Sequence, residues 1–447
     1  MSTATTIQDG DDSSTEPLLP RENSRETKPK SKFRSRLILA CMAAMNVLAN
    51  MAYSTLAPFF PQEAAAKKLT GGSVDLEVGL IFGTFALVVF VVAPLLGVRV
   101  ATIGPKFLLC AGVFLLGGAT LLFGFVSSID DWTSFLVVCF LARAVQGCGA
   151  AAVDTASWTI VATEFPDKIA TVFGALETFS GLGFMIGPAL GGALYKANGF
   201  PLPFFFMGGL LLLCLPGFMY ALPFSMSPTA DQHGPNRPTT WKVLRNIWIW
   251  MTLLTLFMSS ASLGMIEATL ATFLKNTFDM GPATIGLVLL LCCGVYLISA
   301  PIVGHCADRW GTKRIIIVGL FISSVGTLLL APSFLVTSFV PRKKLWLFLL
   351  STGIMALGLS LAAVPTFSDM IRTAQKMGFK KGMVLNGVIS GISTSFFSLG
   401  EAFGPSVGGL ITGKMDFSHA TTIFALALAA HGYIYLILAL CFPSKVK

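Results

Sequence analysis

The stretch APIVGHCADRWGTKR, residues 300–314, determines how the rest of the chain is arranged. It aligns without gaps on APLLGVRVATIGPKF, residues 93–107 of the first half. A second pair, GPALGG at 187–192 and GPSVGG at 404–409, follows in the same order. The chain is therefore an internal duplication, a pattern typical of membrane transporters.

The composition identifies lipid as the solvent of this duplicated chain. Hydrophobic residues make up 54% of its 447 residues and charged residues only 12%, whereas a soluble protein has about a quarter charged residues. Apolar stretches near or above the roughly 20 residues that span a bilayer recur twelve times. The sequence therefore predicts an all-α membrane protein with twelve transmembrane helices in two six-helix pseudo-repeats.

The expected segments follow from these spans. They are a disordered cytosolic tail at 1–36, an N-terminal six-helix half at 37–223, a cytosolic linker at 224–245, a C-terminal half at 246–442 and a cytosolic C-terminus at 443–447. Both termini are placed in the cytosol because Lys and Arg concentrate in the loops on that side. The net charge of +9 thus reflects contact with membrane lipid, and no nucleic-acid partner is expected.

The tail contains one candidate sorting signal. Glu16, Leu18 and Leu19 loosely resemble an acidic dileucine signal, although the acidic residue is closer to the leucines than in the usual pattern. A sorting adaptor at Leu18 and Leu19, in an endosomal, lysosomal or vesicular route, and an inert tail both remain open.

The repeated loop motif matches a known signature. In its second copy it resembles the loop motif of the major facilitator superfamily, with Gly304, Asp308, Arg309, Gly311 and Lys313 in place. In the first copy, Ala101 takes the position of the aspartate. The resemblance implies that these residues control conformational change. A weaker charge latch in the first copy and a latch supplied by the second copy are both open.

Two further motifs resemble the same superfamily. Arg143 and Gln146 match its fourth-helix motif, and an arginine within a span costs about 2.5 to 3.5 kcal/mol to insert. A polar or proton-relay contact and a structural tie to the first or second span are both open for Arg143. Gly187 and Pro188 match the motif associated with antiporters in the fifth helix.

Carboxylates within the spans are the strongest functional signal. Glu177, Glu267 and Glu401 lie in the fifth, seventh and eleventh spans, where each is costly unless it is paired or faces a cavity. We expect them to converge on a central site for a cationic ligand, with Glu267 and Glu401 also coupling transport to protons. Asp154, on the same helical face as Arg143, is expected to be structural or interfacial.

Three uncharged residues complete the expected binding site. Tyr53, Asn50 and Tyr296 are candidates through hydrogen bonds and cation–aromatic attraction. No His or Cys has metal-ligand spacing, and no nucleophile–base arrangement appears. We therefore expect no metal, no cofactor, no catalytic residue and no enzymatic activity.

The chain also resembles the vesicular amine transporter family, and within it the vesicular polyamine transporter branch. The likeness extends over essentially all twelve spans and is clearest at YSTLAPFFP (53–61), LETFSGLG (176–183) and PTF (365–367). This resemblance implies proton-driven exchange of a cytosolic amine into an acidic vesicle.

The acids that the resemblance implies are only partly present. Glu267 matches the seventh-helix acid, and Tyr296 matches the eighth-helix tyrosine, while Glu401 takes the place of a pocket tyrosine of the monoamine carriers. The other charged positions are replaced here by Ala49, Phe85, Ser360 and Thr394. The resemblance therefore argues against a monoamine or acetylcholine carrier.

The expected function is a proton-coupled antiporter that loads spermidine, spermine or related amines into acidic secretory, synaptic, endosomal or lysosomal vesicles. Its partners would be the small cationic amine and protons. The alternatives are a monoamine or drug-type organic cation exporter, and a receptor or scaffold that binds without transporting.

Overall fold

The computed structural model describes residues 32–56, 58–67, 75–222, 238–331 and 344–442. In these ranges twelve helices are long and apolar enough to cross a membrane, which agrees with the predicted number. They are α1 (Lys32–Ser54), α3 (Asp75–Ile103), α4 (Pro105–Phe123), α5 (Trp132–Glu164), α6 (Ile169–Asn198), α7 (Pro201–Ala221), α9 (Ile247–Phe278), α10 (Pro282–Trp310), α11 (Thr312–Leu330), α12 (Leu345–Ala363) with α13 (Thr366–Lys376), α14 (Met383–Lys414) and α15 (Phe417–Cys441).

Short elements complete the described chain. The 3-10 helix η1 (Gly124–Ser128) extends α4, while α2 (Phe60–Lys67) and α8 (Thr240–Leu244) lie outside the long helices. The tenth span is divided into α12 and α13 next to Pro365, whose ring nitrogen cannot donate the helical hydrogen bond. The described residues contain no strand.

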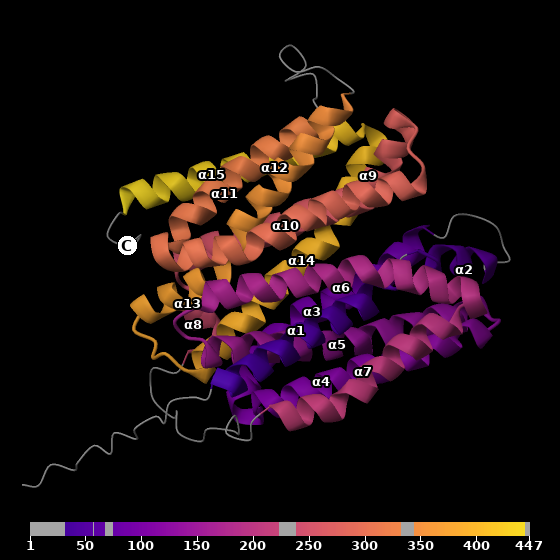
Figure 1. Ribbon diagram of the computed structural model, residues 1–447, viewed down its shortest axis with the longest axis horizontal. Coiled ribbons are helices and arrows are strands. Elements are labelled where there is room, and N and C mark those ends of the chain that lie inside the picture. The colour runs from indigo at the N-terminus through magenta and orange to yellow at the C-terminus, as the bar shows by residue number, and fades with distance from the viewer. Residues whose placement is uncertain (1–31, 57, 68–74, 223–237, 332–343, 443–447) are drawn as a thin grey trace, which may run out of the picture.

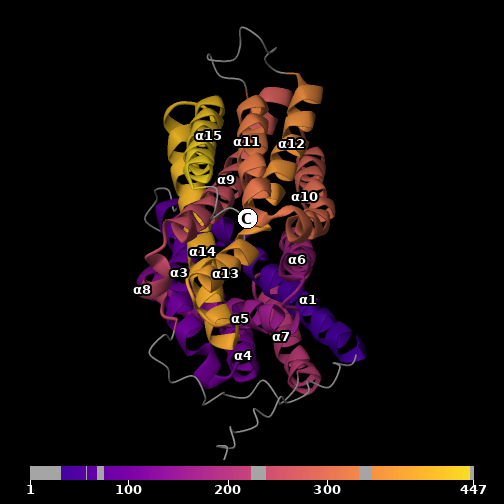
Figure 2. The same ribbon diagram turned by 90° about the vertical axis from the view of Figure 1, so that its left-hand side faces the viewer.

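The long helices form two bundles with the same internal pairing. Figure 1 shows α1–α7 below and α9–α15 above, and Figure 2 shows both bundles from one end. In the first bundle α1 packs on α6, α4 on α5 and α7, and α3 on α5; in the second α9 packs on α14, α11 on α12 and α15, and α10 on α12. The duplication seen in the sequence is therefore a duplication of packing.

The loop motif connects equivalent pairs of helices in the two halves. Equivalent glycines, Gly104 and Gly311, make the turns from α3 to α4 and from α10 to α11 with φ of 94° and 96°. A side chain at either position would strain the backbone. We call the end of the molecule that carries these turns the motif end; α8 and α13 lie there, and α2 lies at the opposite end (Figure 1).

The two bundles meet closely at the motif end. A Cβ on Gly97 of α3 would collide with the backbone of Gly387 and Gly391 of α14. On the other side, a Cβ on Gly304 of α10 would collide with the Ala170 carbonyl of α6. These two seams, α3–α14 and α6–α10, are equivalent in the repeat and depend on close backbone approach.

The second repeated motif brings helices together within each bundle. Gly187 of α6 packs on the Met51 backbone of α1, and Gly404 of α14 packs on the Ala261 backbone of α9. The prolines that follow, Pro188 among them, lie inside α6 and α14. The motif therefore serves the same close packing in both halves.

Some expected segments fall outside the described residues. These include the tail up to residue 31, with Leu18 and Leu19, the linker from 224 to 237, and the C-terminus at 443–447. Helix α1 begins at Lys32 and not at residue 37, and α8 lies within the span expected to be linker.

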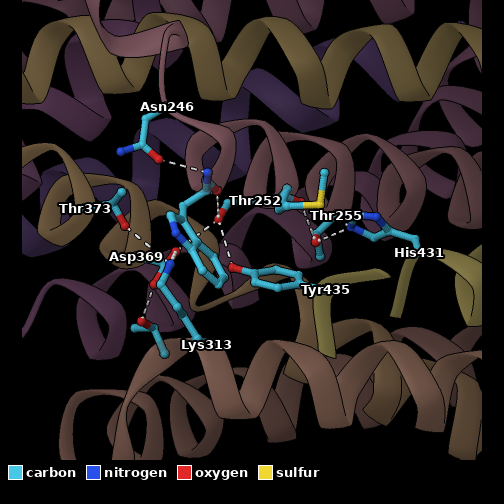
Figure 3. Close-up of polar contacts among 11 residues, drawn as sticks. Asn246, Thr252, Thr255, Lys313, Asp369, Thr373, His431 and Tyr435 are labelled. Carbon is cyan, nitrogen blue, oxygen red and sulfur yellow. Dashed lines mark hydrogen bonds and ion pairs between the residues drawn. The ribbon is translucent and has the colours of Figure 1, made fainter. Parts of the chain in front are cut away.

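A buried ion pair organises the motif end of the second bundle (Figure 3). The Lys313 ammonium lies 2.7 Å from the Asp369 carboxylate, and both side chains are at most 6% exposed. Thr312 and Thr252 donate to the same carboxylate at 2.6 and 3.0 Å, and the Trp248 ring centroid lies 4.7 Å from the ammonium. This pairing, which joins α9, α11 and α13, was not predicted from the sequence.

Replacing one partner of this pair should destabilise the protein. In Asp369→Asn the Lys313 ammonium is left buried without a counter-charge, which costs about 3–5 kcal/mol. Thermal unfolding in detergent should show a clearly lower midpoint, while the double variant Lys313→Met with Asp369→Leu should recover most of the loss. Asp167→Asn, whose side chain is 92% exposed, serves as the control. An unchanged midpoint in Asp369→Asn would contradict this assignment.

Candidate functional site

A cavity of about 210 Å³ lies between the two bundles. Residues of α1, α5 and α6 line it from one half, and residues of α9, α10, α12 and α14 from the other. All six substrate-binding residues expected from the sequence contribute to this lining: Asn50, Tyr53, Glu177, Glu267, Tyr296 and Glu401. The structure therefore brings together residues that are distant in the chain.

The lining is acidic and contains no basic residue. Its four carboxylates are Asp154, Glu177, Glu267 and Glu401, and none of the lining residues is Lys, Arg or His. Among the described residues, no ion pair is recorded for any of the four. Such a cavity concentrates cations through its fixed negative charge.

The uncharged groups of the lining include amide and hydroxyl oxygens that can accept hydrogen bonds. Asn50 donates its amide NH to the Asn46 carbonyl at 2.9 Å, and Asn46 donates to Met42 at 2.8 Å. Each amide keeps its oxygen and a second N–H for other partners, and Ser180 donates to the Asn46 oxygen at 3.1 Å. Oxygen acceptors beside carboxylates suit a ligand that carries several N–H donors.

Aromatic rings close one wall of the cavity. The Tyr53 ring lies 4.8 Å from that of Phe85 and 5.7 Å from that of Phe184, centroid to centroid. The Trp158 and Phe173 rings, at another part of the lining, have centroids 4.2 Å apart and are tilted by 34°. Their faces can attract an ammonium group.

Asp154 also lines the cavity. It was expected to be structural or interfacial, and its place beside the three glutamates was not predicted because the sequence shows only that it shares a helical face with Arg143. Asn46, also in the lining, carried no signal beyond its polarity.

Arg143 lies outside the cavity lining and has aromatic neighbours. Its guanidinium carbon lies 5.2, 5.8 and 5.6 Å from the ring centroids of Phe82, Phe85 and Phe123. It also donates to the Gln146 side chain at 3.1 Å. These contacts tie α5 to α3 and α4, and they favour the structural one of the two interpretations left open by the sequence.

The second copy of the loop motif joins the two bundles. The Asp308 carboxylate accepts from the Thr171 amide at 3.0 Å and from its hydroxyl at 2.8 Å, in the first turn of α6. Its other oxygen is 3.0 Å from Arg372 of α13. An acid at a helix N-terminus is stabilised by the free amides and the helix dipole, so Asp308 latches the α6–α10 seam. Arg309, beside it, is exposed.

The first copy has no such latch at its seam. Ala101 stands at the position of Asp308 and is buried. The repeat places Asn386 opposite the first residue of α6, but α14 already begins at Met383. The amides at this level are therefore bonded inside the helix and have no need of an acid.

The cavity is closed by these contacts at the motif end. Beyond it, the helices of the two bundles diverge toward the end that carries α2 (Figure 1). No group of three or more His, Cys, Asp or Glu in the described part of the chain is arranged for a metal ion.

Comparisons with known proteins agree with this architecture. The profile of the Major Facilitator Superfamily matches residues 42–378 and 252–446. MFS-type transporter SLC18B1 of Mus musculus is 33% identical over 409 residues, which cover 91% of this chain and 87% of that protein. A probable vesicular acetylcholine transporter-B of Danio rerio is 25% identical over 415 residues, covering 89% and 78%. These matches confirm the resemblance drawn from the sequence.

One solved structure shows the same fold. The crystal structure of the human organic anion transporter MFSD10 aligns with a TM-score of 0.70 at 17% identity, over 91% of this chain and 100% of that one. At this identity the likeness describes the fold and not the substrate.

Removing the latch should loosen the start of α6. In Asp308→Ala the Thr171 amide loses its acceptor, so hydrogen–deuterium exchange of the first turn of α6 should become faster. Arg314→Ala, a change at an exposed position three residues after the turn at Gly311, should leave this exchange unchanged. Equal exchange in both variants would mean that Asp308 does not hold the seam.

Proposed function

Because the chain belongs to the major facilitator superfamily and, within it, to the family of MFS-type transporter SLC18B1, we propose that it is a proton-coupled antiporter for polyamines or related organic amines. It would carry them from the cytosol into acidic vesicles. Its relatives are transporters, and the chain is a transporter and not an enzyme.

The observation that carries this proposal is the charge of the cavity. Four carboxylates line a space with no basic side chain, inside a protein that spans a low-dielectric membrane. An uncompensated charge in such a place is strongly unfavourable. Either protons or a cationic ligand must neutralise the acids, and a group that accepts one in exchange for the other performs antiport.

The same argument favours ligands with several amines. One ammonium group cannot neutralise four acids, whereas a polyamine brings several positive charges that are fixed along one chain. The distant relative named for acetylcholine also fits an organic cation. Spermidine and spermine are therefore the substrates we propose.

The proposed cycle uses Glu267 and Glu401 as the proton-coupled acids. On the acidic side of the membrane both would be protonated, and the loss of negative charge would release the amine. On the neutral side they would lose their protons and bind amine again. Rocking of the two bundles about the cavity would expose it to each side in turn.

Transport in a purified system tests the function directly. Proteoliposomes with an imposed inside-acid pH gradient should take up labelled spermidine, and uptake should collapse when the gradient is dissipated. Serotonin, assayed in parallel, should be a poor substrate. Uptake of serotonin alone would place the chain among monoamine carriers, and binding without flux would favour a receptor or scaffold.

A single substitution tests the role of Glu267. Glutamine keeps the shape of the side chain but not its charge, so Glu267→Gln loses a buried charge contact worth about 2–5 kcal/mol. Spermidine uptake should therefore fall by roughly tenfold or more. Asp167→Asn, an exposed acid at the motif end, should transport normally. Wild-type uptake and affinity in Glu267→Gln would remove this residue from the mechanism.

A further inference from the structure

The acids of the cavity lie at different depths along the helices. Helices α6 and α14 both run away from the motif end, and the repeat that aligns Gly187 with Gly404 also aligns Glu177 with Thr394. Glu401 follows Thr394 by seven residues, which is roughly 10 Å at 1.5 Å per residue. Glu177 is thus closer to the motif end than Glu401.

Contacts of α5 place Asp154 at the level of Glu177. The Thr159 hydroxyl bonds that of Ser390 at 3.3 Å. In the other direction, Gly147 packs on the carbonyl of Phe85, next to the Ala86 carbonyl that accepts from Ser398 at 3.2 Å. Asp154 lies between Thr159 and Gly147 in the chain, and so its level on α14 is between Ser390 and Ser398, close to Thr394.

Glu267 lies farther from the motif end than Glu401. Gly264 packs on Pro405, and Met265 packs on Gly408. Glu267 follows both along α9, which also runs away from the motif end. The four acids therefore occupy three successive levels, and we call this arrangement the acid ladder: Asp154 with Glu177, then Glu401, then Glu267.

An independent feature indicates that a ligand binds at the level of Asp154 and Glu177, which is the level closest to the motif end; we call it the deepest level. The Thr394 hydroxyl lines the cavity there, its residue is 7% exposed, and its oxygen has no hydrogen-bond partner. A buried hydroxyl without a partner is costly. A ligand N–H group located between Asp154 and Glu177 would satisfy it.

Resting on the proposed function, we propose that the acid ladder binds a linear polyamine lengthwise, along the helices, and selects it by length. One terminal ammonium binds Asp154, Glu177 and Thr394, and the remaining amines bind Glu401 and Glu267. Asp154 is then a specificity-determining residue. It and Glu177 bind the second terminal ammonium of a long polyamine, whereas a short amine bound at Glu401 or Glu267 does not reach them.

Lengthwise binding also connects the two bundles. Asp154 and Glu177 belong to the first half, whereas Glu401 and Glu267 belong to the second. A long polyamine touches both halves at once. A monoamine neutralises one level and leaves the others charged, so its binding is weaker.

Competition binding without any gradient separates this inference from the proposed function. Protein in nanodiscs is equilibrated with labelled spermidine and displaced by diaminopropane, putrescine, cadaverine, diaminooctane and diaminododecane, with octylamine as the single-charge control. Affinity should rise steeply with length up to diaminooctane, and diaminooctane should exceed octylamine by roughly tenfold or more. Equal affinities for diaminooctane and octylamine would overturn the ladder and leave amine binding intact, whereas binding of no amine would overturn both.

Variants at the deepest level test which residue selects the ligand by its length. Asp154→Asn should weaken diaminooctane and spermidine by roughly ten- to hundredfold and leave octylamine unchanged. Thr394→Val should weaken the same long ligands to a smaller extent, and Asp167→Asn should change none of them. Equal losses for octylamine and diaminooctane in Asp154→Asn would show a general loss of charge or folding and would refute the role in length selection.

Discussion

Uncompensated carboxylates inside a membrane protein are the constraint on which this structure depends. Charge that has no partner in the interior is expensive, so the cavity acids favour bound protons or a bound cation. The cation that the protein does bury elsewhere, Lys313, is paired with Asp369. Arg143 is enclosed by aromatic rings away from the cavity. The interior thus keeps its own positive charges away from the site.

The duplicated packing places that site where both halves can act on it. Glycines allow α3 to approach α14 and α6 to approach α10 closely at the motif end, so the acids are enclosed on that side, while the helices diverge toward the other end (Figure 1). The cavity is therefore a property of the relation between the bundles. Neither bundle alone would bring Glu177 near Glu401.

The sequence predicted the fold and six residues of the cavity lining because an apolar span and an acid or polar group within it can each be recognised from the local sequence. Twelve apolar spans, the repeated glycines and three lone acids can each be recognised without knowing the packing. The place of Asp154 in the cavity was not predicted because its helix also carries a cation, and only the fold shows that Arg143 packs on Phe82 and Phe123. The Lys313–Asp369 pair and the depth order of the acids depend on contacts between distant helices, which no local pattern encodes.

The Asp308 latch makes two seams that look alike in the repeat chemically different. The α6–α10 seam includes a carboxylate on a helix end, whereas the α3–α14 seam is sealed by glycine backbones and serine hydroxyls on carbonyls. Electrostatic contacts weaken with ionic strength, and close apolar packing does not. A rise in ionic strength would therefore weaken the α6–α10 seam more than the α3–α14 seam, although the two are equivalent in the repeat.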